Sequence, residues 1–215
     1  IQGDHYEQFA TYKWLRGVEQ GYADHVENPE MLRYCMQKLA DLAYANSERT
    51  FEAAGGRVIW TWVAEDFGTQ EGLLISPAMI RGFHYPHIKR LCDLAHDYGV
   101  FAFHHSDGAV RDNIPQMIEA GIDVLDPVQW RCRGMEREGL KRDFGDQIGF
   151  HGAMDNQQTV PFGTVEDVRQ EVRDNFRILG EGGGYILGPC HNIQPVTPME
   201  NIVAIYETGY EEGWQ

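Results

Sequence analysis

The stretch Val100-Phe101-Ala102-Phe103-His104-His105-Ser106-Asp107-Gly108 decides the fold, because a short apolar run passes directly into a cluster of polar side chains. The apolar part is rich in aromatic residues and too short for a helix, so it predicts a buried strand. Four other runs in the chain have the same form. We therefore expect five strands, at residues 58–64, 100–105, 122–128, 147–151 and 183–189.

Amphipathic helical patterns separate these runs. Val165, Val168, Val172, Phe176 and Leu179 recur at steps of three and four, which is the period of a helix with one apolar face. Helix starts are predicted from N-cap residues and from proline in the first turn. They fall at Thr164, at Ser76-Pro77, at Asn28-Pro29-Glu30 and, in the form of a capping box, at Thr197-Pro198-Met199-Glu200.

The alternation of strands and helices predicts an α/β fold with a parallel sheet. Five units suit either an open doubly wound sheet or part of a barrel. The absence of a glycine-rich phosphate loop after the run at 58–64 disfavours a dinucleotide-binding fold. A barrel needs eight strands, so we expect a (β/α)8 TIM-like barrel that lacks its N-terminal strands in this chain. The expected organisation is one domain, 1–215, with a helix-rich start at 1–54 and five βα units over 58–215.

Composition narrows the class of protein. The 215 residues are 42% hydrophobic and 24% charged, which is ordinary for a globular domain, and no run of 18 apolar residues predicts a membrane span. The net charge of −15 disfavours binding to nucleic acid or to an anionic membrane. Four cysteines form no CxxC pair, so we expect no disulfide framework and a cytoplasmic location.

Polar side chains gather at the ends of the predicted strands, where βα barrels build their active sites. We expect five of them to face one cavity: Asp66, His105, Asp126, Asp155 and His191. Simpler interpretations stay open for three of these positions. Glu65-Asp66 is also consistent with a solvated loop, Asp126-Pro127 with a turn, and Asp155-Asn156 with the cap of a short turn.

A metal site is the sharpest prediction from these strand ends. His105, Asp107 and Cys190 offer nitrogen, oxygen and sulfur donors, all of which zinc accepts, and three protein ligands leave one position open for a substrate. A thiol bound there would lose its proton and become a nucleophile. The competing interpretation is that Cys190 is a buried structural thiol and that Asp107 caps the turn before Gly108.

Several motifs follow one another over nearly the whole chain in an order typical of one family. They are Asp66-Phe67-Gly68, His105-Ser106-Asp107-Gly108, His151-Gly152-Ala153-Met154-Asp155, Pro161-Phe162-Gly163-Thr164, Gly182-Gly183-Gly184-Tyr185-Ile186 and Pro189-Cys190-His191-Asn192-Ile193-Gln194. With them the sequence resembles the uroporphyrinogen decarboxylase superfamily. That superfamily comprises a cofactor-free decarboxylase of heme biosynthesis and zinc-dependent methyltransferases, which move a methyl group between a corrinoid protein and a thiol or folate acceptor.

The resemblance implies roles for particular residues. The methyltransferases carry a His-x-Cys pair and a later cysteine as zinc ligands, and His105 and Cys190 match the first and the last of these. Asp107 stands where the middle cysteine is expected, which departs from the pattern and gives a harder donor set. His191 matches the late histidine of the decarboxylase. Together with the strand-end positions, the predicted set is zinc on His105, Asp107 and Cys190, with Asp66, Asp126, Asp155 and His191 as catalytic residues.

The resemblance thus predicts an enzyme. The first expectation is a zinc-dependent methyltransferase with a corrinoid protein as partner. The alternative is a uroporphyrinogen decarboxylase, a lyase that acts on a tetrapyrrole substrate and needs no cofactor. A second alternative is a degenerate barrel that binds a tetrapyrrole or a corrinoid without turnover.

Overall fold

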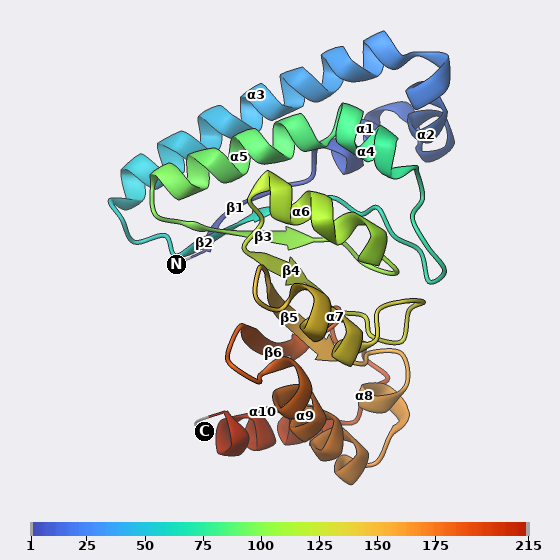
Figure 1. Cartoon of the computed structure of the whole chain (residues 1–215), viewed down its shortest axis with the longest axis vertical. Helices are drawn as coiled ribbons and strands as arrows, with labels where there is room; N and C mark the ends of the chain where they lie inside the picture. The colour runs from blue at the N-terminus through green and yellow to red at the C-terminus, as the bar shows by residue number, and fades with distance from the viewer. Residues whose placement is uncertain (1, 214–215) are drawn as a thin grey trace. The chain divides into compact units, whose positions relative to one another are not determined.

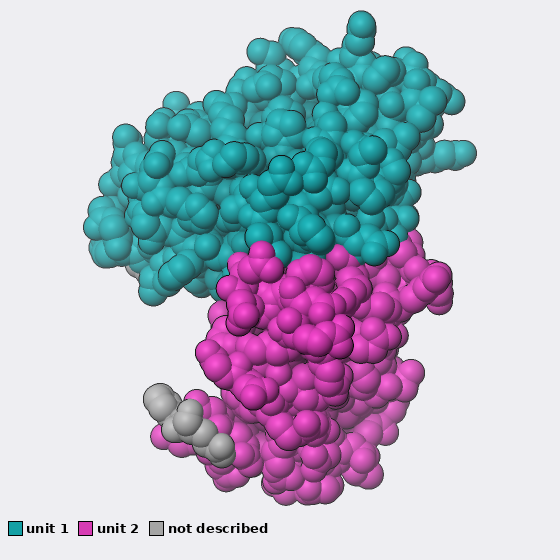
Figure 2. Space-filling model, viewed as in Figure 1, with its two compact units in different colours: residues 1–68, 73–106, 112–124 teal, residues 69–72, 107–111, 125–215 magenta. Residues whose placement is uncertain are grey.

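The computed structural model describes residues 2–213, over which strands and helices alternate along the chain (Figure 1). The chain divides into two compact units, coloured separately in Figure 2. Unit 1 comprises residues 1–68, 73–106 and 112–124, and unit 2 comprises residues 69–72, 107–111 and 125–215.

Unit 1 is a parallel sheet with helices. Strand β2 (Trp60–Val63) pairs with β1 (Gln2–Tyr6) on one side and with β3 (Phe101–His105) on the other. The long helices α3 and α5 pack side by side (Figure 1), and residues of both join Val58 and Val100 in an apolar core. The helices of this unit are α1 (Gln8–Arg16), α2 (Val18–Glu27), α3 (Pro29–Ala54), α4 (Pro77–Phe83), α5 (Tyr85–Asp97) and α6 (Ile114–Ala120).

Unit 2 repeats the strand–helix pattern. Strands β5 (Gly149–Met154) and β6 (Tyr185–Pro189) pair in parallel, with His151 opposite Ile186. The apolar face predicted from the helical period is buried here, since Val168, Val172 and Leu179 are fully covered. The helices are α7 (Arg137–Phe144), α8 (Thr159–Phe162), α9 (Val165–Leu179) and α10 (Met199–Glu212), while β4 (Val124–Asp126) and the short 3-10 helix η1 (Arg111–Asn113) lie where the two units divide.

The prediction of an α/β fold with parallel strands is confirmed. All five predicted runs contain a strand, and β1 is an addition that the sequence analysis did not predict. Its five residues, QGDHY, carry no apolar alternation, and the strand is held by backbone pairing with β2. Among residues 2–213, no helix combines the length and the apolar character that crossing a bilayer requires.

The predicted helix starts have mixed outcomes. Ser76 caps α4 by accepting a hydrogen bond from the backbone N–H of Met79 at 3.2 Å, and Thr164 forms a reciprocal capping box with Asp167 at the start of α9. The capping box predicted over residues 197–200 is wrong. Helix α10 begins after Pro198, whose side chain has no hydrogen-bonding atom to offer the first turn.

Candidate active site at the strand ends

In unit 1 the ends of β2 and β3 bring two of the predicted residues together. The backbone N–H of Glu65 donates to the carbonyl oxygen of His105 at 3.0 Å, which ties the two chain segments. His105 packs edge-on against Trp62, with ring centroids 5.8 Å apart. Its Nε2 atom lies 3.8 Å from Oδ1 of Asp66, and both side chains are partly exposed. The imidazole of His105 and the carboxylate of Asp66 are therefore neighbours that solvent can reach.

Glu65, next to this pair, is a functional candidate that the sequence analysis did not select. Its side chain is 1% exposed, and its Oε1 accepts a hydrogen bond from the N–H of Phe9 at 2.6 Å, in the first turn of α1. Burial raises the pKa of this carboxyl to about 8, although the Phe9 N–H opposes the shift. Glu65 is thus protonated at neutral pH and acts as a buried anchor for α1.

In unit 2 Asp126, the last residue of β4, and His151, inside β5, are in direct contact. Nδ1 of His151 donates to Oδ1 of Asp126. The carboxylate is nearly buried, whereas the imidazole is about a quarter exposed. Only Asp126 of this pair was predicted as a site residue. His151 ends the predicted run at 147–151, which was the available signal, but β5 continues to Met154 and places His151 inside the strand.

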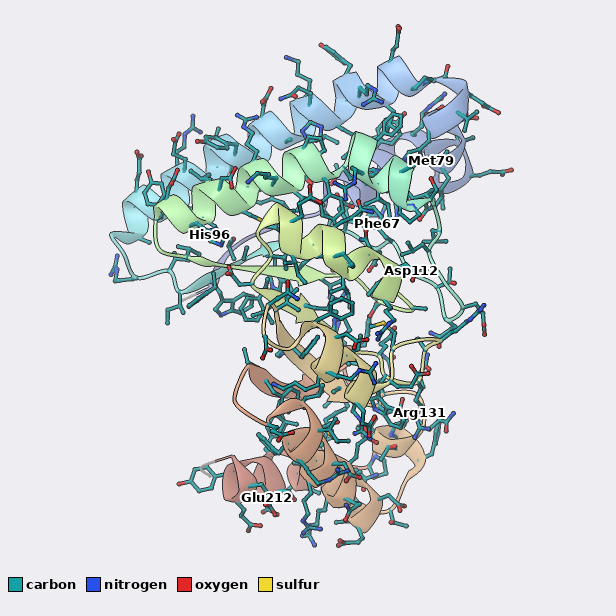
Figure 3. The ribbon with its side chains drawn as sticks, in the orientation of Figure 1. Phe67, Met79, His96, Asp112, Arg131 and Glu212 are labelled. Atoms are coloured by element: carbon teal, nitrogen blue, oxygen red, sulfur yellow. The ribbon has the colours of Figure 1, made fainter. Side chains whose placement is uncertain are left out.

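Asp155, after β5, is held by several partners. Nε of Arg131, which comes from the segment between β4 and α7 (Figure 3), donates to Oδ2 of Asp155 at 2.5 Å. The backbone N–H groups of Gln157 and Thr159 donate to the same carboxylate at 2.9 and 3.1 Å. These bonds make Asp155 the anchor of the turn that leads into α8, as the simpler interpretation expects. Its catalytic role stays a prediction.

Cys190 lies directly after β6 and is 4% exposed. Its backbone N–H donates to the carbonyl oxygen of Met154 at 2.9 Å, and its thiol donates to the carbonyl oxygen of Val128 at 3.2 Å. Burial raises the pKa of the thiol well above its ordinary value, and the carboxylates of Glu171 and Asp155 raise it further. The neutral thiol is therefore the favoured form at this position.

A small cavity of about 10 Å³, enough for roughly one water molecule, adjoins Cys190. Asp155, Asn156, Trp130 and Cys132 are among the residues that line it. His191, the next residue along the chain, is exposed, and its carbonyl oxygen accepts a hydrogen bond from the side-chain amide of Asn156 at 2.5 Å. The cavity suits a small polar group and not a whole substrate.

The predicted set falls into both units. Unit 1 holds Asp66 and His105, and unit 2 holds the other five predicted residues: Asp107, Asp126, Asp155, Cys190 and His191. The convergence of the catalytic set on one cavity, and of His105, Asp107 and Cys190 on one metal ion, stay predictions.

Comparisons with known proteins agree on one family. A family model described as uroporphyrinogen decarboxylase (URO-D) matches residues 10–211. The chain is 24% identical over 189 residues to a uroporphyrinogen decarboxylase of Anaeromyxobacter sp. (strain Fw109-5), covering 87% of this chain and 50% of that protein. It is 26% identical over 183 residues to a uroporphyrinogen decarboxylase of Pseudomonas putida (strain GB-1), covering 81% and 47%. The chain thus spans about half the length of these curated relatives.

The fold is similar to that of a solved structure. A methyltransferase from Methanosarcina mazei aligns with a TM-score of 0.75 over 98% of this chain and 58% of that chain, at 20% sequence identity. At this identity the likeness concerns the fold alone.

Proposed function

The chain belongs to the uroporphyrinogen decarboxylase family, and from this premise we propose that it acts in methyl transfer between a corrinoid protein and a thiol or folate acceptor. The fold agrees with the family, since the parallel α/β arrangement is that of a partial (β/α)8 barrel, as predicted from the sequence. The choice of methyl transfer within the family rests on the chain's own residues.

The observation that carries the proposal is the buried thiol of Cys190 at the end of β6. Burial first, and then the carboxylates of Glu171 and Asp155, raise the pKa of this thiol and make a thiolate unfavourable there unless a cation is bound. Zinc takes thiolate ligands and deprotonates a coordinating cysteine. Cys190 is therefore unsuited to act as an unassisted nucleophile, and a bound zinc ion would be the cation that stabilises its thiolate.

We propose His105, Asp107 and Cys190 as the zinc ligands. Imidazole nitrogen, carboxylate oxygen and thiolate sulfur are all donors that zinc accepts, and three of them leave the open position that a catalytic site needs. Asp66, 3.8 Å from Nε2 of His105, adds negative charge that favours a cation beside this imidazole. A zinc ion bound here would lower the pKa of an acceptor thiol, so that the thiolate forms near neutral pH.

A uroporphyrinogen decarboxylase is the second candidate, because the curated relatives at 24–26% identity carry that name. Under this alternative the chain needs no metal, and His191 would correspond to the late histidine of the decarboxylase. Cys190 would then be a buried structural thiol that donates to the carbonyl oxygen of Val128.

Metal analysis of three forms of the chain separates these candidates. Wild type purified without chelator should hold roughly one zinc ion per chain, and Cys190→Ser should lose it because the thiolate ligand is gone. Cys92→Ser is the matched control, since Cys92 is also buried, on α5 in unit 1, and does not line the cavity beside Cys190, so the variant should keep its zinc. A metal-free wild type, or equal zinc in all three proteins, contradicts the proposed site.

Activity measurements complete the test. Wild type and Cys92→Ser should transfer a methyl group from methylcobalamin to a small thiol, and Cys190→Ser should not. Release of carbon dioxide from uroporphyrinogen by wild type and Cys190→Ser alike would instead establish the decarboxylase alternative.

A further inference from the structure

We propose that His151, oriented by Asp126, accepts the proton that the acceptor thiol loses during methyl transfer. This inference rests on the proposed function and adds a proton acceptor to it. The family resemblance assigned His151 no role.

The orientation of the imidazole follows from its contact with the carboxylate. Asp126, the last residue of β4, accepts a hydrogen bond from Nδ1 of His151 on β5. An ionised carboxylate only accepts, so Nδ1 carries the hydrogen and a neutral ring has its lone pair on Nε2. The backbone N–H of Val128 also donates to the carbonyl oxygen of His151 at 2.9 Å, which fixes the main chain that carries the ring.

The neighbouring strand leaves room for this ring by means of a glycine. A Cβ atom placed on Gly188 of β6 would lie 2.8 Å from Nε2 of His151 and 3.0 Å from its Cε1. Nε2 therefore faces β6, and Cys190 follows two residues after Gly188 along the chain. The basic nitrogen is turned toward the strand whose end carries the proposed metal ligand.

The proton balance of the reaction requires such a group. When a thiol takes a methyl group from a methylated corrinoid, the methyl–cobalt bond breaks with its electron pair left on cobalt, and a sulfur–carbon bond forms. The S–H bond of the thiol breaks in the same overall reaction, and its proton passes to Nε2 of His151. The buried Asp126 carboxylate then stabilises the imidazolium through the Nδ1 hydrogen bond.

The test uses His151→Gln and Asp126→Asn in the full chain. Glutamine cannot take the proton, and the asparagine amide can donate to Nδ1 and so place the ring hydrogen on Nε2. Both variants should lower kcat for methyl transfer from methylcobalamin to a thiol by about 10²–10⁴-fold, with little change in KM for the thiol. His96→Gln is the matched control, because Nε2 of His96 lies 2.9 Å from the Asp123 carboxylate in an exposed pair of unit 1, and it should keep wild-type kcat.

Nitrogen-15 NMR of the histidine rings gives a readout that does not depend on turnover. The His151 ring should carry its hydrogen on Nδ1 in wild type and on Nε2 in Asp126→Asn. Gly188→Ala, which displaces the ring while keeping both polar partners, should also lower kcat, and urea unfolding checks that each variant is folded.

Two results overturn the inference alone: wild-type kcat in folded His151→Gln, or a wild-type ring that carries its hydrogen on Nε2. A wild type that holds zinc but transfers no methyl group overturns the proposed function, and the inference with it.

Discussion

At the scale of single residues, Glu65 should make the stability of the protein depend on pH. Its pKa of about 8 in the folded chain exceeds its ordinary value of 4.5, so the folded state keeps a proton that the unfolded state releases. Because the folded state binds more protons, the contribution is fully present below about pH 4.5 and is lost as the pH rises through 8. The free energy of unfolding should therefore fall across this range.

Glu65→Gln tests this prediction. The glutamine oxygen can still accept from the N–H of Phe9 but has no proton to lose, so its stability relative to wild type should rise with pH. Urea unfolding at pH 5, 7 and 8.5 measures the difference, with the exposed Glu71→Gln as control. A constant difference between Glu65→Gln and wild type across the three pH values would show that Glu65 does not titrate as proposed.

At the scale of elements, the capping box at the start of α9 should contribute measurably to stability. The N–H of Asp167 donates to Oγ1 of Thr164 at 3.2 Å, and the Asp167 carboxylate accepts from the N–H of Thr164 at 2.8 Å. Thr164→Ala removes one half of this box and should lower the free energy of unfolding by about 1 kcal/mol. Thr197→Ala is the matched control, because the sequence suggests the same motif there but α10 has no side-chain cap. Equal losses in the two variants would contradict the structural difference between them.

At the scale of the whole molecule, the net charge of −15 should make unfolding sensitive to salt. Repulsion among the excess carboxylates opposes the compact state, and salt screens it over a Debye length of about 10 Å at 0.1 M. The melting temperature at pH 7.5 should therefore rise between about 10 and 200 mM NaCl. The rise should be smaller at pH 5, where more carboxyl groups are protonated. A fall in melting temperature with salt at pH 7.5 would mean that local ion pairs outweigh the overall repulsion.

The predictions that succeeded from sequence were those with local causes. The period of Val168, Val172 and Leu179 is a property of one helix, and its face is buried as expected. The cap at Thr164 also succeeded, because its partner is three residues away. The cap predicted at Thr197 failed because the helix begins one residue later, so that Pro198 occupies the N-cap position. Strand β1 was missed because its residues, QGDHY, have no apolar alternation, so only its pairing with β2 makes it a strand.

The sequence by itself therefore determined the order of strands and helices, the parallel α/β class and the concentration of polar residues at strand ends, since these follow from short-range periodicity. Only the tertiary structure decided which of those polar residues meet. Asp126 and His151 are 25 positions apart, and Glu65 and Phe9 are 56 apart, so their contacts depend on how neighbouring strands and helices are placed. The raised pKa of Glu65 likewise could not be predicted from neighbouring residues, because segments distant in the sequence bury its side chain.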